Sequence, residues 1–88
     1  MNKQQRFIED MTVQRGIDFA RIGMMVMVGN EVGTITGMNG SANLNVVFAN
    51  QLKFGKAPNN CHPTYNICYF DKNGKIIKDY RKGGLREG

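Results

Sequence analysis

Short apolar segments interrupted by glycine and asparagine constrain the fold of this chain more than any other feature. Residues 24–28, 32–38 and 43–49 are apolar on at least one face, and turn-forming residues separate them. Gly33 and Gly37 bracket an isoleucine in the second segment, which is typical of a strand that bends sharply. The pattern predicts a small, tightly curved antiparallel sheet.

The flanking segments add a helix and two further strands. Residues 3–15 have helical periodicity, and Gly16 is suited to end that helix in the left-handed conformation. We expect strands at residues 64–70 and 75–80, joined by a tight turn at 71–74, because Asn-Gly readily adopts the positive φ values of such turns. The predicted fold is therefore mainly β, a small barrel of about five antiparallel strands with the N-terminal α-helix on its open end.

Length and composition indicate one folded domain. A chain of 88 residues has surface for one modest core, and an apolar content of 41% is typical of a folded protein. We assign the domain to residues 1–80 and expect residues 81–88, which are basic and glycine-rich, to form a flexible tail. The chain lacks the roughly 20 consecutive apolar residues that cross a bilayer, and it lacks the apolar leader of a secretory signal. These features predict a cytoplasmic protein that does not enter the membrane.

The two cysteines agree with a reducing compartment. Cys61 and Cys68 are separated by a segment that we expect to be extended, at roughly 3.3 Å per residue, which is too long for a disulfide. A sharp bend at His62-Pro63 would allow the pairing, but nothing in the sequence requires such a bend. We therefore expect two free thiols.

Positive charge is concentrated in the second half of the chain. Twelve lysine and arginine residues oppose seven aspartate and glutamate residues, which gives a net charge of +5. Cations of the second half are Lys53, Lys56, Lys72, Lys75, Lys78, Arg81, Lys82 and Arg86. This balance allows nucleic acid or an acidic protein surface as the partner.

A long polar connection at residues 50–63 carries the strongest binding pattern. Lys53, Phe54 and Lys56, with Tyr65 soon after, alternate positive charge with aromatic rings. That combination suits single-stranded nucleic acid, since cations follow the phosphates and rings stack on bases. The alternative for Phe54 is a structural role as a cap on the barrel core.

The segment around the only histidine favours binding over catalysis. Cys61, His62 and Cys68 do not match a known zinc spacing, and a fourth ligand is missing, so we expect no metal. Neighbouring side chains on an extended chain point in opposite directions, which places His62 poorly to activate Cys61. We therefore expect no catalytic residue, no enzyme activity and no cofactor. Asn60 and His62 would instead hydrogen-bond the loop or contact a partner.

The polar loop at residues 37–43 has two interpretations. Its small residues and backbone amides suit contacts with phosphate, although the loop contains no lysine and matches no phosphate-binding motif. The simpler interpretation is a wide hairpin turn.

Two resemblances add expectations about function. Gly23, Val26 and Val28, followed by Gly33-Thr34-Ile35, resemble the start of SH3-like barrels of the KOW type. Residues 33–37, 41–48, 60–65 and 69–74 resemble small uncharacterised proteins of bacteriophages and prophages. The first resemblance implies binding of RNA, DNA or protein surfaces, mainly through loops, and it does so by analogy of fold.

The sequence thus leads to two functional hypotheses. The first is a non-enzymatic module that binds RNA or DNA through Lys53, Phe54, Lys56, Asn60, His62 and Tyr65. The alternative is a protein-interaction module of phage or prophage origin that docks on a host protein. Met24, Met25 and Met27 favour the alternative, since a thioether-rich surface adapts to protein partners. The helix or a second copy of the chain would cover that surface.

Overall fold

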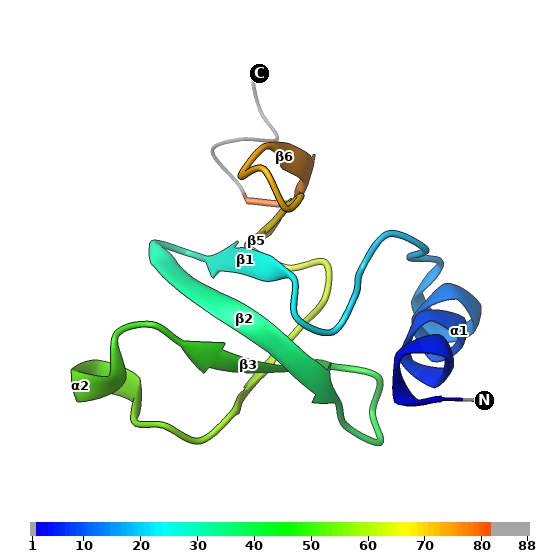
Figure 1. Cartoon of the computed structure of the whole chain (residues 1–88), viewed down its shortest axis with the longest axis horizontal. Helices are drawn as coiled ribbons and strands as arrows, with labels where there is room; N and C mark the ends of the chain where they lie inside the picture. The colour runs from blue at the N-terminus through cyan, green and yellow to red at the C-terminus, as the bar shows by residue number, and fades with distance from the viewer. Residues whose placement is uncertain (1, 82–88) are drawn as a thin grey trace.

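The structure has the mainly β architecture that the sequence predicts. The computed structural model describes residues 2–81, so the expected basic tail lies outside the described residues apart from Arg81. Six strands form one sheet, with a helix at the N-terminus (Figure 1). In chain order the elements are α1 (Lys3–Arg15), β1 (Met25–Val28), β2 (Glu31–Met38), β3 (Leu44–Phe48), α2 (Gln51–Phe54), β4 (Asn59–Cys61), β5 (Ile67–Phe70) and β6 (Ile76–Asp79).

Helix α1 lies where the periodicity predicts it and has both ends capped. The side chain of Asn2 accepts a hydrogen bond from the amide of Gln5, and the Gln5 side chain accepts one from the amide of Asn2. This reciprocal pair satisfies amides that the first turn would leave free. At the other end, Gly16 has a φ of 68° and its amide donates to the carbonyl of Thr12.

All neighbouring strands of the sheet are antiparallel. The order is β4-β3-β2-β1-β5-β6, so β1 lies between β2 and β5. Among the described residues the ladders end at β4 and β6, which makes the sheet open. The sheet is strongly twisted, and β5 and β6 turn away from β2 and β3 (Figure 1).

The structure differs from the predicted strands at two places. The connection at residues 50–63 contains α2 and the short edge strand β4, which raises the number of strands from about five to six. The strand predicted at residues 64–70 begins only at Ile67, because a turn precedes it in which Asn66 has a φ of 54°.

Strand β2 bends across the sheet as its glycines predict. The register between β2 and β3 shifts between Ile35 and Gly37, which is a β-bulge at Thr36. At Gly33 the two strands approach so closely that a Cβ atom would lie 2.5 Å from Cγ1 of Val46 and 3.0 Å from the carbonyl oxygen of Val47. This position therefore requires glycine for space.

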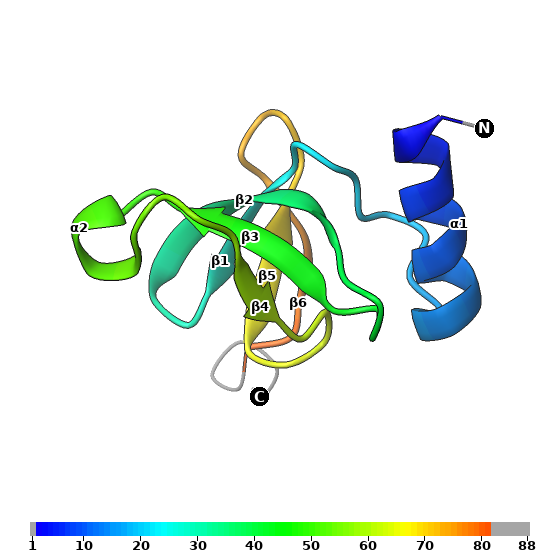
Figure 2. The same cartoon turned by 90° about the horizontal axis from the view of Figure 1, so that it is seen from below.

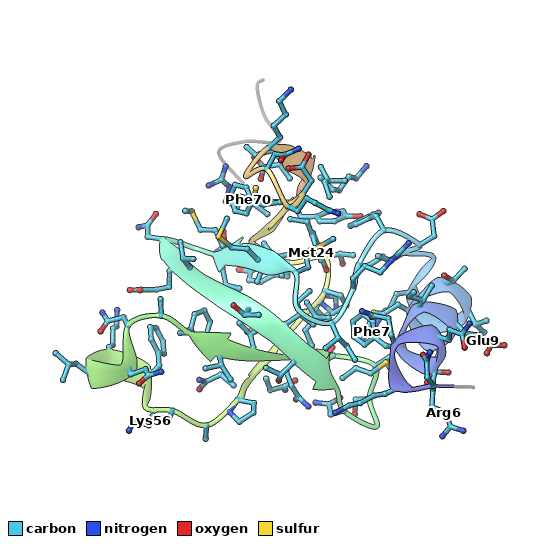
Figure 3. The ribbon with its side chains drawn as sticks, in the orientation of Figure 1. Arg6, Phe7, Glu9, Met24, Lys56 and Phe70 are labelled. Carbon is cyan, nitrogen blue, oxygen red and sulfur yellow. The ribbon has the colours of Figure 1, made fainter. Side chains whose placement is uncertain are left out.

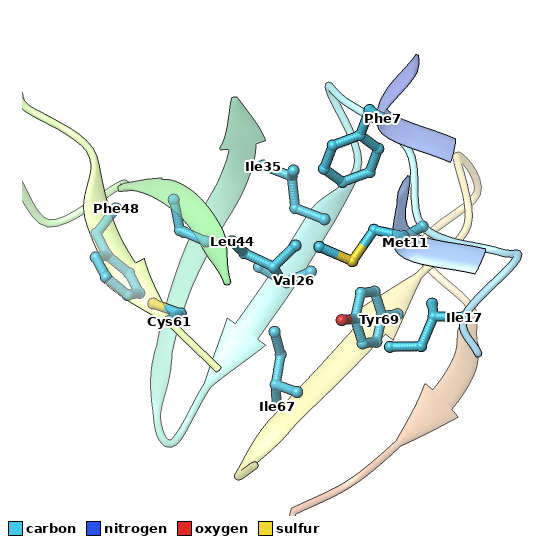
Figure 4. Close-up of a cluster of buried hydrophobic side chains, with 12 residues drawn as sticks. Phe7, Met11, Ile17, Val26, Ile35, Leu44, Phe48, Cys61, Ile67 and Tyr69 are labelled. Atoms are coloured by element: carbon cyan, nitrogen blue, oxygen red, sulfur yellow. The ribbon is translucent and has the colours of Figure 1, made fainter. Parts of the chain in front are cut away.

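The core lies between the concave face of the sheet and α1. Phe7 and Met11 of α1 point toward Val26, Ile35 and Tyr69 of the sheet (Figure 4). Leu44, Val46 and Phe48 alternate inward along β3, as predicted. Both cysteines are free thiols, as expected, and both are buried. No helix within residues 2–81 is long and apolar enough to cross a membrane.

Candidate binding surfaces

Phe54 and Lys53 of the predicted loop surface contact each other and neighbouring residues of the fold. The Phe54 ring is half-buried and packs on the ring of Phe48, with 4.4 Å between centroids. Lys53 Nζ lies 3.2 Å from Oε2 of Glu31 and 5.3 Å from the centroid of Phe54. Phe54 thus caps the core, which was the structural alternative, and Glu31 offsets the charge of Lys53.

The other four residues of that surface are exposed. Lys56 and Tyr65 project into solvent, and Lys56 lies on the α2 side of the molecule (Figure 3). Asn60 accepts a hydrogen bond from Nδ2 of Asn39, with a length of 2.8 Å. His62 Nδ1 accepts one from the amide of Thr64 at 3.2 Å. Asn60 therefore bonds the turn between β2 and β3, and His62 bonds its own loop, which leaves few free groups on this surface.

The loop before β5 is fixed from inside the core. The hydroxyl of Tyr69, which is fully buried, donates a 2.6 Å hydrogen bond to the carbonyl of Pro63. Burial raises the pKa of Tyr69 well above its usual range. Cys61 is buried while His62 is exposed, so these neighbours face opposite ways. Burial also raises the pKa of the Cys61 thiol, which lowers its reactivity.

A second surface, the hairpin groove, lies between the segment before β1 and the β5–β6 hairpin. It has a volume of about 670 Å³. Its apolar lining comes from Phe19, Ile22, Met24, Met25, Phe70 and Ile77. Met24 and Phe70 lie on the same side of the molecule (Figure 3). The polar residues at the groove include Arg21, Asp71 and Lys72.

The turn of the β5–β6 hairpin determines where its lysines lie. Asp71 Oδ1 accepts hydrogen bonds from the amides of Asn73 and Lys75, at 2.8 and 2.9 Å, and Gly74 has a φ of 82°. The turn and β6 consequently present Lys72, Lys75 and Lys78 to solvent.

The acidic groups of the hairpin are engaged locally. Asp79 Oδ2 lies 2.9 Å from Nη2 of Arg81, and the hydrogen bonds from Arg81 lower the pKa of Asp79. Within the part of the chain that the structure describes, the ion pairs are Asp79–Arg81 and Lys53–Glu31. Arg21 and Lys72 line the groove and belong to neither pair, and they give it a positive rim.

A smaller surface, the helix hollow, lies between α1 and the β2–β3 turn and has a volume of about 450 Å³. Lys3, Arg6 and Asp10 contribute to it from α1. Thr36, Asn39 and Asn45 contribute polar groups from the opposite wall, and Phe7 and Met38 contribute apolar ones.

The hairpin groove was not predicted as a site, although a signal for it exists in the sequence. Lys72, Lys75 and Lys78 follow one another at intervals of three residues and contribute to the positive charge of the second half of the chain. The predicted hairpin turn would have placed these lysines together. Their alignment with the segment before β1 depends on the long-range pairing of β1 with β5, which no local pattern specifies.

Comparisons of this chain with protein-family models, with curated proteins and with solved structures find no match. Among the described residues, no group of three or more histidine, cysteine, aspartate or glutamate side chains could hold a metal ion. The geometry of the surfaces is therefore the basis for a functional proposal.

Proposed function

We propose that this chain is a non-enzymatic module that binds nucleic acid, with the hairpin groove as its main binding surface. The observation that carries the proposal is an apolar and partly aromatic groove whose rim has unpaired cations, Arg21 and Lys72, while the nearby carboxylates are engaged in local bonds.

This combination suits a polyanion with exposed bases. Phosphates would lie along Arg21 and Lys72 of the groove and along the exposed Lys75 that follows the turn, and a base would contact the floor formed by Met24 and Phe70. Few cations are available, so the affinity is expected to be modest and to fall steeply with salt. Lys56, Asn60, His62 and Tyr65 remain a predicted second contact.

The finer fold assignment belongs to the same proposal. An SH3-like barrel of the KOW type is supported by the order of the sheet, in which β1 pairs with β2, β2 with β3 and β3 with β4. The pairing of β5 with β1 supports it as well. The strong bend of β2 at its glycines and bulge supports the curvature that such a barrel requires. An origin in bacteriophages or prophages and a location in the cytoplasm remain predictions from the sequence.

The second candidate function is docking on a host protein. The apolar share of the groove favours it, since Met25 is 38% exposed and Ile77 is 41% exposed at the groove. A partner would need an apolar anchor flanked by acidic residues to match Arg21 and Lys72.

Fluorescence anisotropy with labelled single-stranded RNA, single-stranded DNA and duplex DNA, at low and near-physiological salt, tests the proposal. Replacing Lys72 and Lys75 by glutamine should weaken binding about tenfold and lower the salt slope by about 1.4, at about 0.7 per phosphate contact. The matched control replaces Lys53 and Lys56 by glutamine, which removes the same charge from the predicted loop surface.

The two variants separate the possible interfaces. Loss of binding only in the Lys72 and Lys75 variant supports the hairpin groove. Loss only in the Lys53 and Lys56 variant overturns the groove in favour of the loop surface. If wild-type protein binds none of the three probes, nucleic-acid binding is wrong, and a protein partner becomes the leading candidate.

A further inference from the structure

The hairpin groove and the helix hollow meet at one residue. Ile22 lines both surfaces and is half-buried between them. Its backbone is held by the side chain of Gln4, which donates to the Ile22 carbonyl at 3.1 Å and accepts from the Ile22 amide at 2.8 Å. The boundary between the two surfaces is therefore a fixed part of the fold.

The chemistry of the helix hollow is similar to that of the hairpin groove. Each surface has two cations and one carboxylate: Lys3, Arg6 and Asp10 in the hollow, and Arg21, Lys72 and Asp71 in the groove. Neither Lys3 nor Arg6 forms an ion pair within residues 2–81. Each surface also has an apolar floor. In the hollow it is formed by Met38, which is half-buried, beside Phe7, which is almost fully buried in the core.

The wall of the hollow that faces α1 adds groups that hydrogen-bond. Thr36, Asn39 and Asn45 line this wall at the end of β2 and the start of β3. Asn39 is fixed in place, because its side chain accepts from the amides of Ser41 and Asn43. Asn39 also donates to Asn60, and the Thr36 hydroxyl donates to the carbonyl of Asn45. Among the described residues, the side-chain amide of Asn45 is therefore the group of this wall that is left to bind the edge of an unpaired base.

We propose that the two surfaces form one continuous track for single-stranded nucleic acid, which passes over Ile22. The inference rests on the proposed function and extends it by naming the form of the ligand. The cations at the two ends would bind separate phosphates, and the two apolar floors would each accept an unpaired base. A duplex keeps its bases stacked inside and would reach the cations without filling the floors.

The proposal predicts that binding depends on the length of the strand. The protein measures 37 × 32 × 26 Å, so a track across it is consistent with the site sizes of roughly 4–16 nucleotides known for small single-strand modules. A strand of about 3 nucleotides would occupy one surface, whereas a strand of about 12 nucleotides would reach both.

The test compares these two lengths on three full-length proteins by fluorescence anisotropy. The first is the wild type, and the second carries Lys3→Gln and Arg6→Gln. The third carries Val13→Glu and Gln14→Glu, which change the net charge equally at exposed residues that line neither surface. We expect the hollow variant to bind the longer strand about tenfold more weakly than the control does and to lower its salt slope by about 1.4. Binding of the short strand should be equal in both variants. Circular dichroism would verify that each variant keeps its helix.

The outcomes distinguish failure of the track from failure of the proposed function. If wild-type protein binds both strands but the hollow variant behaves as the control does, the track is wrong and the single groove stands. If the hollow variant loses the short and long strands equally, the hollow is the only site and the track is again wrong. If wild-type protein binds neither strand, both proposals fall. Tighter binding of duplex than of the longer single strand would also overturn the track.

Discussion

Nη2 of Arg15, in the last turn of α1, lies 2.9 Å from Oδ1 of Asn43, immediately before β3. The same guanidinium donates to the carbonyls of Ser41 and Ala42, each at 3.1 Å. Ala42 has a φ of 61°, a left-handed conformation that residues other than glycine rarely adopt. The helix thus holds a strained turn of the sheet in place through one side chain.

Replacing Arg15 by lysine should lower the free energy of unfolding by about 1–2 kcal/mol, because a single ammonium cannot make the three bonds of the guanidinium. Urea denaturation measures the change. Arg6→Lys provides the control, since the structure shows no hydrogen bond from the Arg6 side chain to residues 2–81. Equal stability of the two variants would contradict a stabilising role for Arg15.

Replacing Gly33 by alanine should destabilise the protein by about 1–3 kcal/mol, since the new methyl group would overlap Val46 and force β2 from β3. Gly40→Ala is the matched control, because nothing lies within 4 Å of its added Cβ atom. Thermal unfolding of the two variants gives the comparison. If the Gly33 variant is as stable as the Gly40 variant, moving β2 away from β3 does not lower the stability of the protein.

Replacing Tyr69 by phenylalanine should cost about 1–2 kcal/mol, because the buried carbonyl of Pro63 loses its hydrogen-bond donor. The substitution should also change the dependence of stability on pH. The folded state raises the pKa of Tyr69, so its contribution is complete below the unfolded pKa of about 10 and falls as pH rises above it.

Urea denaturation between about pH 8 and 11 measures both effects of the Tyr69 substitution. The free energy of unfolding of the wild type should decline more steeply above about pH 10 than that of the variant. Parallel curves over this range would exclude Tyr69 as a source of the alkaline decline.

Replacing Asp71 by asparagine should strengthen nucleic-acid binding roughly threefold, since it removes a negative charge at the hairpin groove. The amide oxygen of asparagine still accepts from Asn73 and Lys75, so the turn should persist. Glu9→Gln removes the same charge from the outer side of α1 (Figure 3) and should leave the affinity almost unchanged. An equal gain in both variants would indicate an effect of net charge alone.

The sequence predicts those elements that depend on residues close together in the chain. The α1 helix has its own caps, β3 has an alternating pattern, and the turn at 71–74 has an Asn-Gly pair, and all three were predicted. Strand β4 was missed because its two asparagines lack an apolar pattern, and it forms by pairing with β3. The helix α2 was missed because it has only one turn, capped by the side chain of Asn50.

The candidate site was less predictable because it depends on distant parts of the chain. The sequence allowed Phe54 either to stack on a base or to cap the core. Its packing on Phe48 shows that it caps the core. The residues that line the hairpin groove come from two distant segments, residues 19–25 and residues 70–77. The helix hollow likewise joins α1 with the turn between β2 and β3, two segments that no local pattern relates. Figure 2 shows the helix and this turn from below.

The two hydrogen bonds between Gln4 and Ile22 make the first turn of α1 part of the architecture of both surfaces. Gln4 completes the backbone bonding of Ile22 much as a neighbouring strand would. Removal of the N-terminal residues would therefore release the segment that leads into β1 and reshape a surface far along the chain. A shortened N-terminus is thus a change to the hairpin groove itself, although Gln4 does not line it.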